Sequence, residues 1–408
     1  MHAVVFAIFG LTYALIALRR LRVLPIGRAA GAMLGATLML VVGAISPEEA
    51  YRAVDHDTLL LLFGMMVITA RLADVGFFDV ASHAVLRVTR TPRRLLVAVS
   101  LLSGVMSAFM VNDTVCLFLT PVVVAACARG QLPMGPYLLA VATSANLGSA
   151  ATLVGNPQNM LIGSQSGLSF AEFAAHAAPA AIVALLLNTG LLLIYFGRKV
   201  ARSPALELGR PRHYRRGDLA LPLGVLAVVI GAFFFGAHLG VATLAGAAFL
   251  VATQRRDATA TFARVDWPLL VFFAGLFVVV AALRGTGVVE DAWAWAAPGL
   301  GLDDAGGIAG FTAFAALGSN VVSNVPMVLL TGPYLPLLGH AELGWVLLGY
   351  VTTVAGNITL VGSVANIIVA ERAADHYTLG FVEYLRFGAV STAVALLTGV
   401  PLIVVGFR

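Results

Sequence analysis

Long apolar runs alternate with short polar segments along the whole chain. The longest runs approach the length at which a helix crosses a bilayer; they cover 3–18, 28–45, 58–70, 180–196, 219–236, 268–282 and 385–405. Because such runs recur to the end of the chain, we do not expect the first to be a removable signal peptide, and it also lacks a basic leading segment. The pattern predicts an all-α polytopic membrane protein.

Two groups of residues occur twice, at almost the same separation. Thr152-Leu153-Val154-Gly155 with Asn159 returns 207 positions later as Thr359-Leu360-Val361-Gly362 with Asn366. A longer stretch, which includes Asp55, Gly64, Gly76 and Asp79, returns 211 positions later with Asp266, Gly275, Gly287 and Glu290. The chain is therefore predicted to be two copies of one membrane unit.

Composition narrows the class of protein. With 60% hydrophobic and 11% charged residues, a soluble fold of 408 residues could not hide the apolar surface. The net charge of +5 resides in short loops between the apolar runs, so we expect no nucleic-acid partner. Cys116 and Cys127 lie in apolar sequence, so neither a disulfide framework nor a zinc site is expected, and no motif indicates a cofactor.

Basic loops mark the cytoplasmic side and give the threading. The strongest is a linker at 198–218, which separates a first repeat, 1–197, from a second, 219–408. Each repeat is predicted to hold five crossings and one re-entrant helical hairpin; the hairpins are 95–128 and 305–338, and the crossings broken at mid-membrane are 137–165 and 344–369. An odd number of crossings inverts the second repeat and leaves both termini outside the cytoplasm. Arg71 and Asp74, three positions apart near the cytoplasmic end of their span, can pair.

An alternative reads the first hairpin as two ordinary spans, 95–110 and 115–128. Each is short for a crossing, and the turn between them, Val111-Asn112-Asp113-Thr114, is polar. A carboxylate at mid-membrane is costly unless it faces a cavity or a partner, so the re-entrant interpretation is favoured.

Four polar, glycine-rich interruptions stand out: two hairpin tips, near 112–114 and 319–326, and two helix breaks, 144–159 and 356–366. Unwound backbone frees carbonyls that coordinate cations and helix N-termini that attract anions. Small polar residues also pack at ordinary helix crossings. Four interruptions arranged as two pairs favour a transport site instead. The candidate substrate- or ion-binding residues are Asn112, Asp113, Thr114, Asn146, Gly148, Ser149, Asn156, Asn159, Ser323, Asn324, Gly356, Asn357, Thr359, Ser363 and Asn366.

Asp113 is the only acid at either tip, and the nearest basic residue in the sequence is Arg129, at the far end of its hairpin arm. One negative charge without a fixed positive one favours a proton or Na⁺, and a neutral or singly charged oxyacid over a multiply charged anion. A possible Na⁺ site comprises Asn112, Asp113, Asn146 and Gly148. Alternatively, Asp113 caps the second hairpin arm.

At these residues the sequence resembles the ion transporter superfamily, which includes arsenite-efflux permeases, divalent-anion/sodium symporters and NhaD-type sodium/proton antiporters. The motifs Val111-Asn112-Asp113-Thr114 and Gly155-Asn156-Pro157-Gln158-Asn159 are most similar to bacterial anion permeases and plant silicon-efflux transporters. The second half fits the same branch, at 319–326 and 355–363.

The resemblance implies a homodimer, an elevator motion, and one clamshell per repeat made by a hairpin tip and the facing break. The first clamshell would use Asn112, Asp113, Thr114, Asn146, Gly148 and Asn156, and the second Ser323, Asn324, Gly356, Asn357 and Ser363. Both tips of the dicarboxylate symporters read Ser-Asn-Thr, whereas here they read Asn-Asp-Thr and Ser-Asn-Val. The departure disfavours a dicarboxylate, and Val325 makes the second cation site the poorer one.

These features favour a secondary transporter, in a cell's inner (plasma) membrane, for a small oxyacid or inorganic anion such as arsenite, antimonite or silicic acid, coupled to H⁺ or Na⁺. Alternatives are a Na⁺/H⁺ antiporter, a sodium-coupled di- or tricarboxylate or sulfate symporter, and a passive channel. An enzyme is not expected, since Asp74 and Asp113 lack the motif of an intramembrane aspartyl protease. The expected partners are the lipid bilayer, the transported solute and a second copy of the chain.

Overall fold

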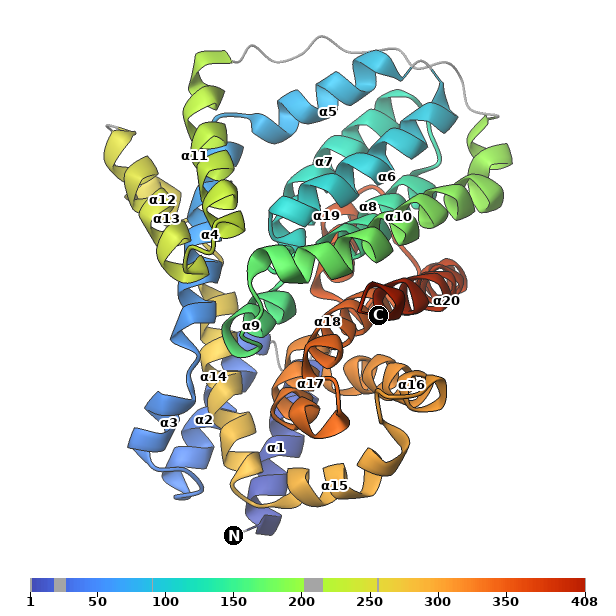
Figure 1. The fold of residues 1–408 in the computed structure, drawn as a ribbon. Coiled ribbons are helices and arrows are strands. Elements are labelled where there is room, and N and C mark those ends of the chain that lie inside the picture. The colour runs from blue at the N-terminus through green and yellow to red at the C-terminus, as the bar shows by residue number, and fades with distance from the viewer. Residues whose placement is uncertain (1, 18–26, 90, 202–215, 255–256, 408) are drawn as a thin grey trace.

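The computed structural model describes residues 2–17, 27–89, 91–201, 216–254 and 257–407, and within these ranges every regular element is a helix (Figure 1). The first half contains α1 (His2–Ala17), α2 (Arg28–Val41), α3 (Pro47–Ala53), α4 (His56–Asp74), α5 (Phe77–Val88), α6 (Pro92–Phe109), α7 (Asn112–Arg129), α8 (Met134–Ser149), α9 (Pro157–Gln165) and α10 (Phe170–Ala201). The second half contains α11 (Arg216–Phe234), α12 (Leu239–Thr253), α13 (Thr259–Phe262), α14 (Trp267–Arg284), α15 (Val288–Ala296), η1 (Ala297–Gly299), α16 (Ala305–Val322), α17 (Asn324–Thr331), η2 (Gly332–Leu338), α18 (Ala341–Ala355), α19 (Val364–Ala373) and α20 (Phe381–Gly406).

Seven of the described helices are long and apolar enough to cross a membrane, namely α4, α6, α7, α10, α14, α16 and α20. Shorter apolar helices, such as α2, α12 and α18, accompany them. The protein is thus a multi-pass, all-helical membrane protein, as the hydrophobic pattern predicts. The count of ten crossings and their orientation stay predictions. Much of the basic sequence behind that orientation, including 202–215 of the linker, 19–22, 90 and 255–256, lies outside the described residues.

The arms of the first hairpin are longer than the sequence suggested. α6 and α7 have 18 residues each, so the expectation that each arm is too short to cross was wrong. Thr91 begins α6 early, because its hydroxyl accepts the N–H of Arg94 and Pro92 follows at the first helical position. The re-entrant interpretation now depends on the tip, where Asn112 and Asp113 are only 3% and 8% exposed.

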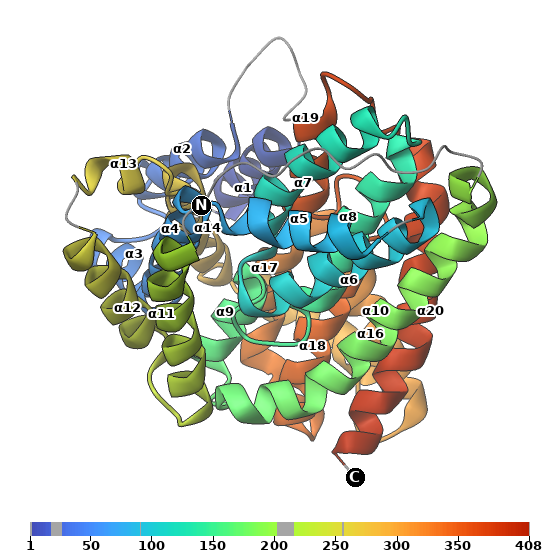
Figure 2. The same ribbon diagram turned by 90° about the horizontal axis from the view of Figure 1, so that it is seen from above.

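The helices pack as two bundles (Figures 1 and 2). The scaffold bundle comprises α1–α4 and α11–α14, and the hairpin bundle comprises α6–α10 and α16–α20. At the centre of the hairpin bundle, α8 is buried from Gly135 to Ser149 and α18 from Leu343 to Ala355. A helix surrounded on all sides needs apolar or small residues on every face, and both helices have them. Both helix breaks therefore begin deep inside the protein.

Close glycine contacts hold the scaffold bundle together, and each of them joins a helix of one half to a helix of the other half. A side-chain carbon on Gly64 of α4 would lie 2.6 Å from Thr243 Cβ of α12, and one on Gly275 of α14 would lie 2.8 Å from the Ala32 backbone of α2. The two contacts are related by the repeat, since 275 − 64 and 243 − 32 both equal 211. α4 and α14 also run in opposite directions in Figure 1. A two-fold relation between the halves predicts such a pair of contacts, in which equivalent helices pack on equivalent partners from the other half.

The bundles are connected by equivalent bends. Gly76 before α5 and Gly287 before α15 both adopt φ +79°, a left-handed conformation that glycine adopts without strain. Beyond Gly287, α15 is fixed to the second hairpin by the Tyr334 hydroxyl, which donates to Glu290 Oε1 at 2.6 Å. This hydrogen bond holds the pKa of Glu290 below its ordinary value.

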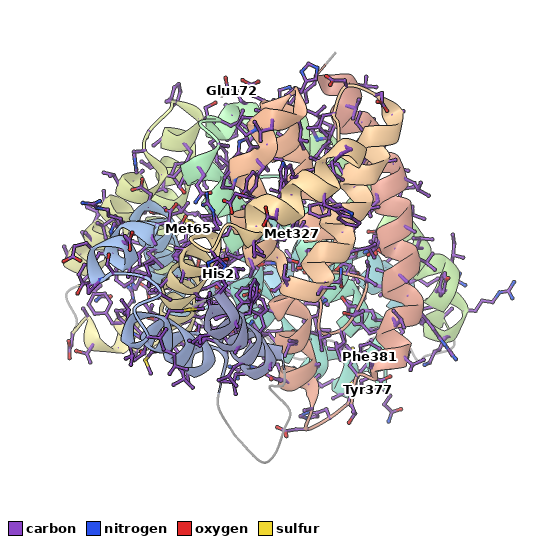
Figure 3. All side chains as sticks on the ribbon, turned by 90° about the horizontal axis from the view of Figure 1, so that it is seen from below. His2, Met65, Glu172, Met327, Tyr377 and Phe381 are labelled. Carbon is purple, nitrogen blue, oxygen red and sulfur yellow. The ribbon has the colours of Figure 1, made fainter. Side chains whose placement is uncertain are left out.

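The arms of the second hairpin meet closely near its tip. Met327 of α17 occupies the space beside Gly318 of α16, where any side chain on that glycine would collide with the methionine sulfur. Seen from below, Met327 lies near the middle of the molecule, with Tyr377 and Phe381 toward one edge (Figure 3). The second tip is therefore anchored inside the protein by packing.

The Gly64–Thr243 contact gives a stability prediction. Gly64→Ala should lower the stability of the detergent-purified protein by about 1–3 kcal/mol, because α4 and α12 must separate to admit the methyl group. Thermal unfolding measures the effect. Gly190→Ala in α10 is the matched control, since nothing lies within 4 Å of its added carbon, and it should be neutral or stabilising. Equal melting temperatures for the two variants would refute the close-approach argument.

Candidate functional site

Both breaks are held by one asparagine each, in the same way. Asn159 Nδ2 donates to the carbonyls of Ser149 (3.3 Å) and Thr152 (2.9 Å). Asn366 Nδ2 donates to the carbonyls of Gly356 (2.8 Å) and Thr359 (3.1 Å). All three residues of each set are related by the 207-residue offset. The carboxamides thus satisfy carbonyls freed by unwinding, which in a membrane have no water to turn to.

The Asn146 carboxamide joins the two halves at the centre of the site. Its oxygen accepts from Asn112 Nδ2 (2.9 Å) and Ser363 Oγ (3.1 Å). Its nitrogen donates to the side-chain oxygens of Asn357 (2.8 Å) and Asn366 (2.9 Å). Asn146 is 1% exposed, so all of its hydrogen-bonding capacity is used within the protein. The structure therefore brings four other candidate residues together around the side chain of Asn146.

A second junction repeats the first with the halves exchanged. Asn156 Nδ2 donates to Thr353 Oγ1 at 3.2 Å, while Ser363 Oγ donates to Asn146 Oδ1 at 3.1 Å. Adding 207 to Asn146 gives Thr353, and adding 207 to Asn156 gives Ser363. Thr353, which also accepts from Gln158 Nε2 at 3.0 Å, was missed as a candidate. Applying the repeat offset to Asn146 would have found it.

The first tip is docked, and its acid is not a helix cap. Asn112 N–H donates to the Gly155 carbonyl at 2.9 Å, which ties the tip to the first break. Val111 occupies the N-cap position of α7, without a side-chain cap, and Asp113 lies inside the helix. The capping interpretation of Asp113 was therefore wrong.

The cation closest to Asp113 in the sequence is not its partner in space. Its carboxylate interacts electrostatically with Arg28 of α2 and with Asp266 at the start of α14, both in the scaffold bundle. Arg129, by contrast, ends α7. The four interruptions themselves contain no Lys or Arg, as expected, but the charge of Arg28 in the other bundle acts on Asp113, which a search along the chain around Asp113 could not reveal.

The second tip is strained and leaves acceptors unused. Ser323 has φ +74° and ψ 161°, a region that side-chain-bearing residues rarely adopt. Next to it, the side-chain oxygens of Asn324 and Asn320 are buried and have no hydrogen-bond partner among the described residues. The Asn320 nitrogen donates to the carbonyls of Ala316 and Ala355, both at 3.0 Å. Asn320 was named at the tip but not chosen as a candidate.

Of the remaining candidates, Ser149 uses its hydroxyl, which donates to the Asn146 carbonyl at 2.8 Å and accepts from Asn156 Nδ2 at 3.0 Å, and the others contribute backbone or no side-chain bond among the described residues. Gly148 packs directly on the Gly104 backbone, Ser149 and Gly356 supply carbonyls, and Thr359 supplies a carbonyl to Asn366. Thr114 lies partly buried in the first turn of α7. In the possible Na⁺ set, the side-chain oxygens of Asn112 and Asn146 already accept hydrogen bonds, so that site stays a prediction.

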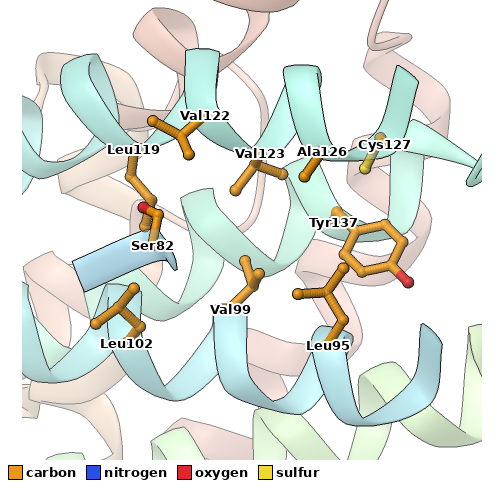
Figure 4. Close-up of a pocket in the computed structure, with 10 residues that line it drawn as sticks. All are labelled: Ser82, Leu95, Val99, Leu102, Leu119, Val122, Val123, Ala126, Cys127 and Tyr137. Carbon is orange, nitrogen blue, oxygen red and sulfur yellow. The ribbon is translucent and has the colours of Figure 1, made fainter. Parts of the chain in front are cut away.

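Two cavities lie away from these residues. A small one of about 20 Å³ lies among α5, α6, α7 and α8 (Figure 4) and is lined almost wholly by apolar side chains such as Val99, Leu119 and Val123. It is too small for more than about one water molecule. A larger cavity of about 340 Å³ lies between the bundles, beside α4, α9 and the turn from α11 to α12; Asp57, Glu172 and His238 line it.

Asp74 belongs to a structural cluster. It lies 3.7 Å from Arg71, as the spacing predicted, and 2.9 Å from Arg264 Nε. Among the described residues, Asp74 thus forms ion pairs with two arginines and is not paired with a second carboxylate, as acid–base catalysis by two acids would require.

Comparisons with known proteins agree on one class. Residues 13–355 match the sequence profile of the family described as CitMHS, citrate transporter. The chain is 31% identical to a Dictyostelium discoideum protein named as transporter arsB, over 93% of this chain and 88% of that one. It is 33% identical to the silicon efflux transporter LSI3 of Oryza sativa subsp. japonica, over 97% and 96%. The crystal structure of the Alcanivorax borkumensis YdaH transporter, described as having an unusual topology, shares the fold, with a TM-score of 0.55 at 18% identity over 91% of this chain and 88% of that one.

The central junction predicts the effect of an isosteric change. Asn146→Asp should cost roughly 3 kcal/mol or more, because a carboxylate oxygen would face the oxygens of Asn357 and Asn366 that now accept hydrogen bonds. Denaturation in detergent measures the loss. Gln131→Glu makes the same amide-to-acid change at an exposed position and should change stability little; a similar loss in both variants would contradict the central role.

The strained tip predicts a gain. Ser323→Gly should raise stability by about 1 kcal/mol, since glycine adopts this backbone region freely. Ser319→Gly, within α16, is the matched control and should lower stability by roughly 0.5–1 kcal/mol. Thermal unfolding of both proteins decides; a loss at Ser323 equal to that at Ser319 would show that the tip is not strained.

Proposed function

The chain belongs to the citrate transporter (CitMHS) family, and from this premise we propose that it is a secondary active transporter for a small oxyacid or inorganic anion, coupled to H⁺ or Na⁺. The family and its relatives are transporters rather than enzymes. The proposal concerns which solute is carried and which ion drives its transport.

The observation that supports an oxyacid is the pair of unused acceptors at the second tip. The side-chain oxygens of Asn320 and Asn324 are buried without donors, and leaving such groups unpaired costs about 1–3 kcal/mol each. A ligand that carries hydroxyl groups, such as arsenous, antimonous or silicic acid, would donate to them. A fully ionised polycarboxylate has mainly acceptor oxygens and would not.

Charge supports the same conclusion. None of the four interruptions contains Lys or Arg, and the cation near Asp113, Arg28, shares its surroundings with Asp266. A multiply charged anion in this site would lack compensation, which makes burial costly. The name of one relative, a silicon efflux transporter, concerns a solute of the class we propose.

Asp113 is our candidate for the coupling group. It is the only acid at either tip, it is 8% exposed, and its neighbours across the bundle boundary are charged. A carboxyl group there can hold a proton or contribute an oxygen to a bound Na⁺. If the hairpin bundle moves as an elevator against the scaffold bundle, Asp113 changes its distance from Arg28 and Asp266, and this change would couple ion binding to motion. Assembly as a homodimer in an inner membrane, with both termini outside the cytoplasm, completes the proposal.

One observation favours a second candidate. Unpartnered amide oxygens beside backbone carbonyls also suit Na⁺, which prefers neutral oxygen ligands, so a Na⁺/H⁺ antiporter or a sodium-coupled symporter of the same fold is the alternative. These candidates differ in which solute evokes proton movement.

Proteoliposomes that contain a pH-sensitive dye test both. The vesicles are challenged in turn with arsenite, silicate, phosphate, sulfate, succinate, citrate, and Na⁺ or Li⁺ salts. We expect an oxyacid to evoke proton flux, and Asp113→Asn to abolish that flux while leaving the melting temperature unchanged. Asp291→Asn, the same change at an exposed position of α15, should retain wild-type flux. Flux evoked only by Na⁺ or Li⁺ would move the protein to the antiporter candidate, and accumulation against a gradient by Asp113→Asn would remove Asp113 from coupling.

A further inference from the structure

One contact joins the bundles in only one of the two halves. Asp55, the N-cap of α4 in the scaffold bundle, accepts a hydrogen bond from Ser164 Oγ at 2.6 Å and one from Gln165 Nε2 at 3.4 Å. Ser164 and Gln165 end α9, in the hairpin bundle. Thr58 Oγ1 lies 3.4 Å from the same serine hydroxyl. Any sliding of one bundle past the other has to break these hydrogen bonds.

The repeat supplies an equivalent set at the start of α14. Asp55 corresponds to Asp266, and each caps its helix through the N–H three residues on, of Thr58 (2.8 Å) and Leu269 (3.1 Å). With the offset of 207, Ser164 and Gln165 correspond to Glu371 and Arg372, which lie near the end of α19. The amide donor of Gln165 is therefore matched by the guanidinium of Arg372, whereas the hydroxyl donor of Ser164 is matched by the carboxylate of Glu371, so in the second half only Arg372 can bind the aspartate.

The second set is separated in this structure. α4 packs on α7 and α14 on the equivalent α17, but the packing of α4 on α9 has no counterpart of similar extent between α14 and α19 in the described part of the chain. Within the described parts of the chain, the second oxygen of Asp266 accepts no hydrogen bond and exposed Arg372 forms no ion pair. Asp266 has instead the electrostatic surroundings of Asp113, which also include Arg28. Both halves have residues suited to this contact, but only the first half forms it in this structure.

Two halves related by a two-fold axis can exchange conformations, and the exchanged state uses the equivalent contacts. We propose that Asp266 and Arg372 form an ion pair in the opposite transport state, in which the contact of Asp55 with Ser164 and Gln165 is broken. We call these two alternative contacts between the bundles latches. In the first, neutral donors bind the carboxylate of Asp55, and in the second, the charged guanidinium of Arg372 binds the carboxylate of Asp266. This inference rests on the proposed alternating access but not on the identity of the solute.

The first latch is accessible to water, which lets it open. Ser164 lines the cavity of about 340 Å³ between the bundles, together with Asp57 and His238, which lie 3.5 Å apart. An exposed ion pair such as Asp266–Arg372 is worth at most about 1 kcal/mol. Both latches are therefore weak enough to alternate during transport.

Disulfide trapping tests the proposal without altering either carboxylate. Thr58→Cys with Ser164→Cys should cross-link in the state described here, and the equivalent pair, Leu269→Cys with Glu371→Cys, should cross-link in the opposite state. Each disulfide should abolish transport, and reduction should restore it. Thr58→Cys with Glu371→Cys combines one residue from each latch and should not cross-link. The native Cys116 and Cys127 are buried, and single-cysteine variants control for them.

Charge removal tests the ion pair itself. In the background of the second cysteine pair, Arg372→Gln and Asp266→Asn should each lower the yield of the disulfide by up to about five-fold, and together by no more than either alone. Asp266→Asn keeps an oxygen that can cap α14, so folding is preserved. In the first cysteine pair neither change should lower the yield.

Two results would overturn the proposal. One is that no disulfide forms between positions 269 and 371, in a variant whose reduced form transports solute, under oxidation that forms the 58–164 disulfide in the other variant. The other is full independence of the 269–371 yield from both charges. Because cross-linking requires no solute, an absence of oxyacid flux with both disulfides formed would overturn the proposed function alone.

Discussion

The structure depends on satisfying the backbone polar groups of two helices that are interrupted inside the protein. Unwinding 150–156 and 356–363 frees carbonyls where lipid and apolar side chains exclude water. Asn159 and Asn366 supply the missing donors, each to two carbonyls. Without them the breaks would be too costly to keep, and without the breaks there would be no irregular backbone at depth to form a site.

Asn146 connects the two halves of the site. Its carboxamide uses both of its ends across the boundary between the halves, so the first tip and the second break are fixed relative to each other. The junction between Asn156 and Thr353 repeats this with the halves exchanged. A buried network in which most polar groups are paired is rigid, and rigidity of this core is what allows the hairpin bundle to move as a unit in the proposed mechanism.

The two tips differ although the breaks behind them match. The first tip is tied to Gly155 and carries the only acid, while the second carries the strained Ser323 and the unused oxygens of Asn320 and Asn324. In the proposed function, the first tip binds the coupling ion and the second tip binds the solute. The difference also fits the contacts between bundles: among the described residues, the carboxylate of Asp55 accepts a hydrogen bond from the other bundle, whereas that of its equivalent Asp266 accepts one only from Leu269 of its own helix.

The sequence by itself determined the helical membrane class, the positions of both breaks and most of the residues that meet around Asn146, while the organisation into two inverted copies stays a prediction. It could do so because apolar length, glycine and proline placement and internal repetition are local properties of the chain. The roles of Thr353 and Arg28, the position of Asp113 inside α7 and the strain at Ser323 were decided only by the tertiary structure. Each depends on which residues from distant segments share a space, and a hydrogen bond between positions 197 apart, such as Asn156 to Thr353, leaves no trace in the pattern on either side of it.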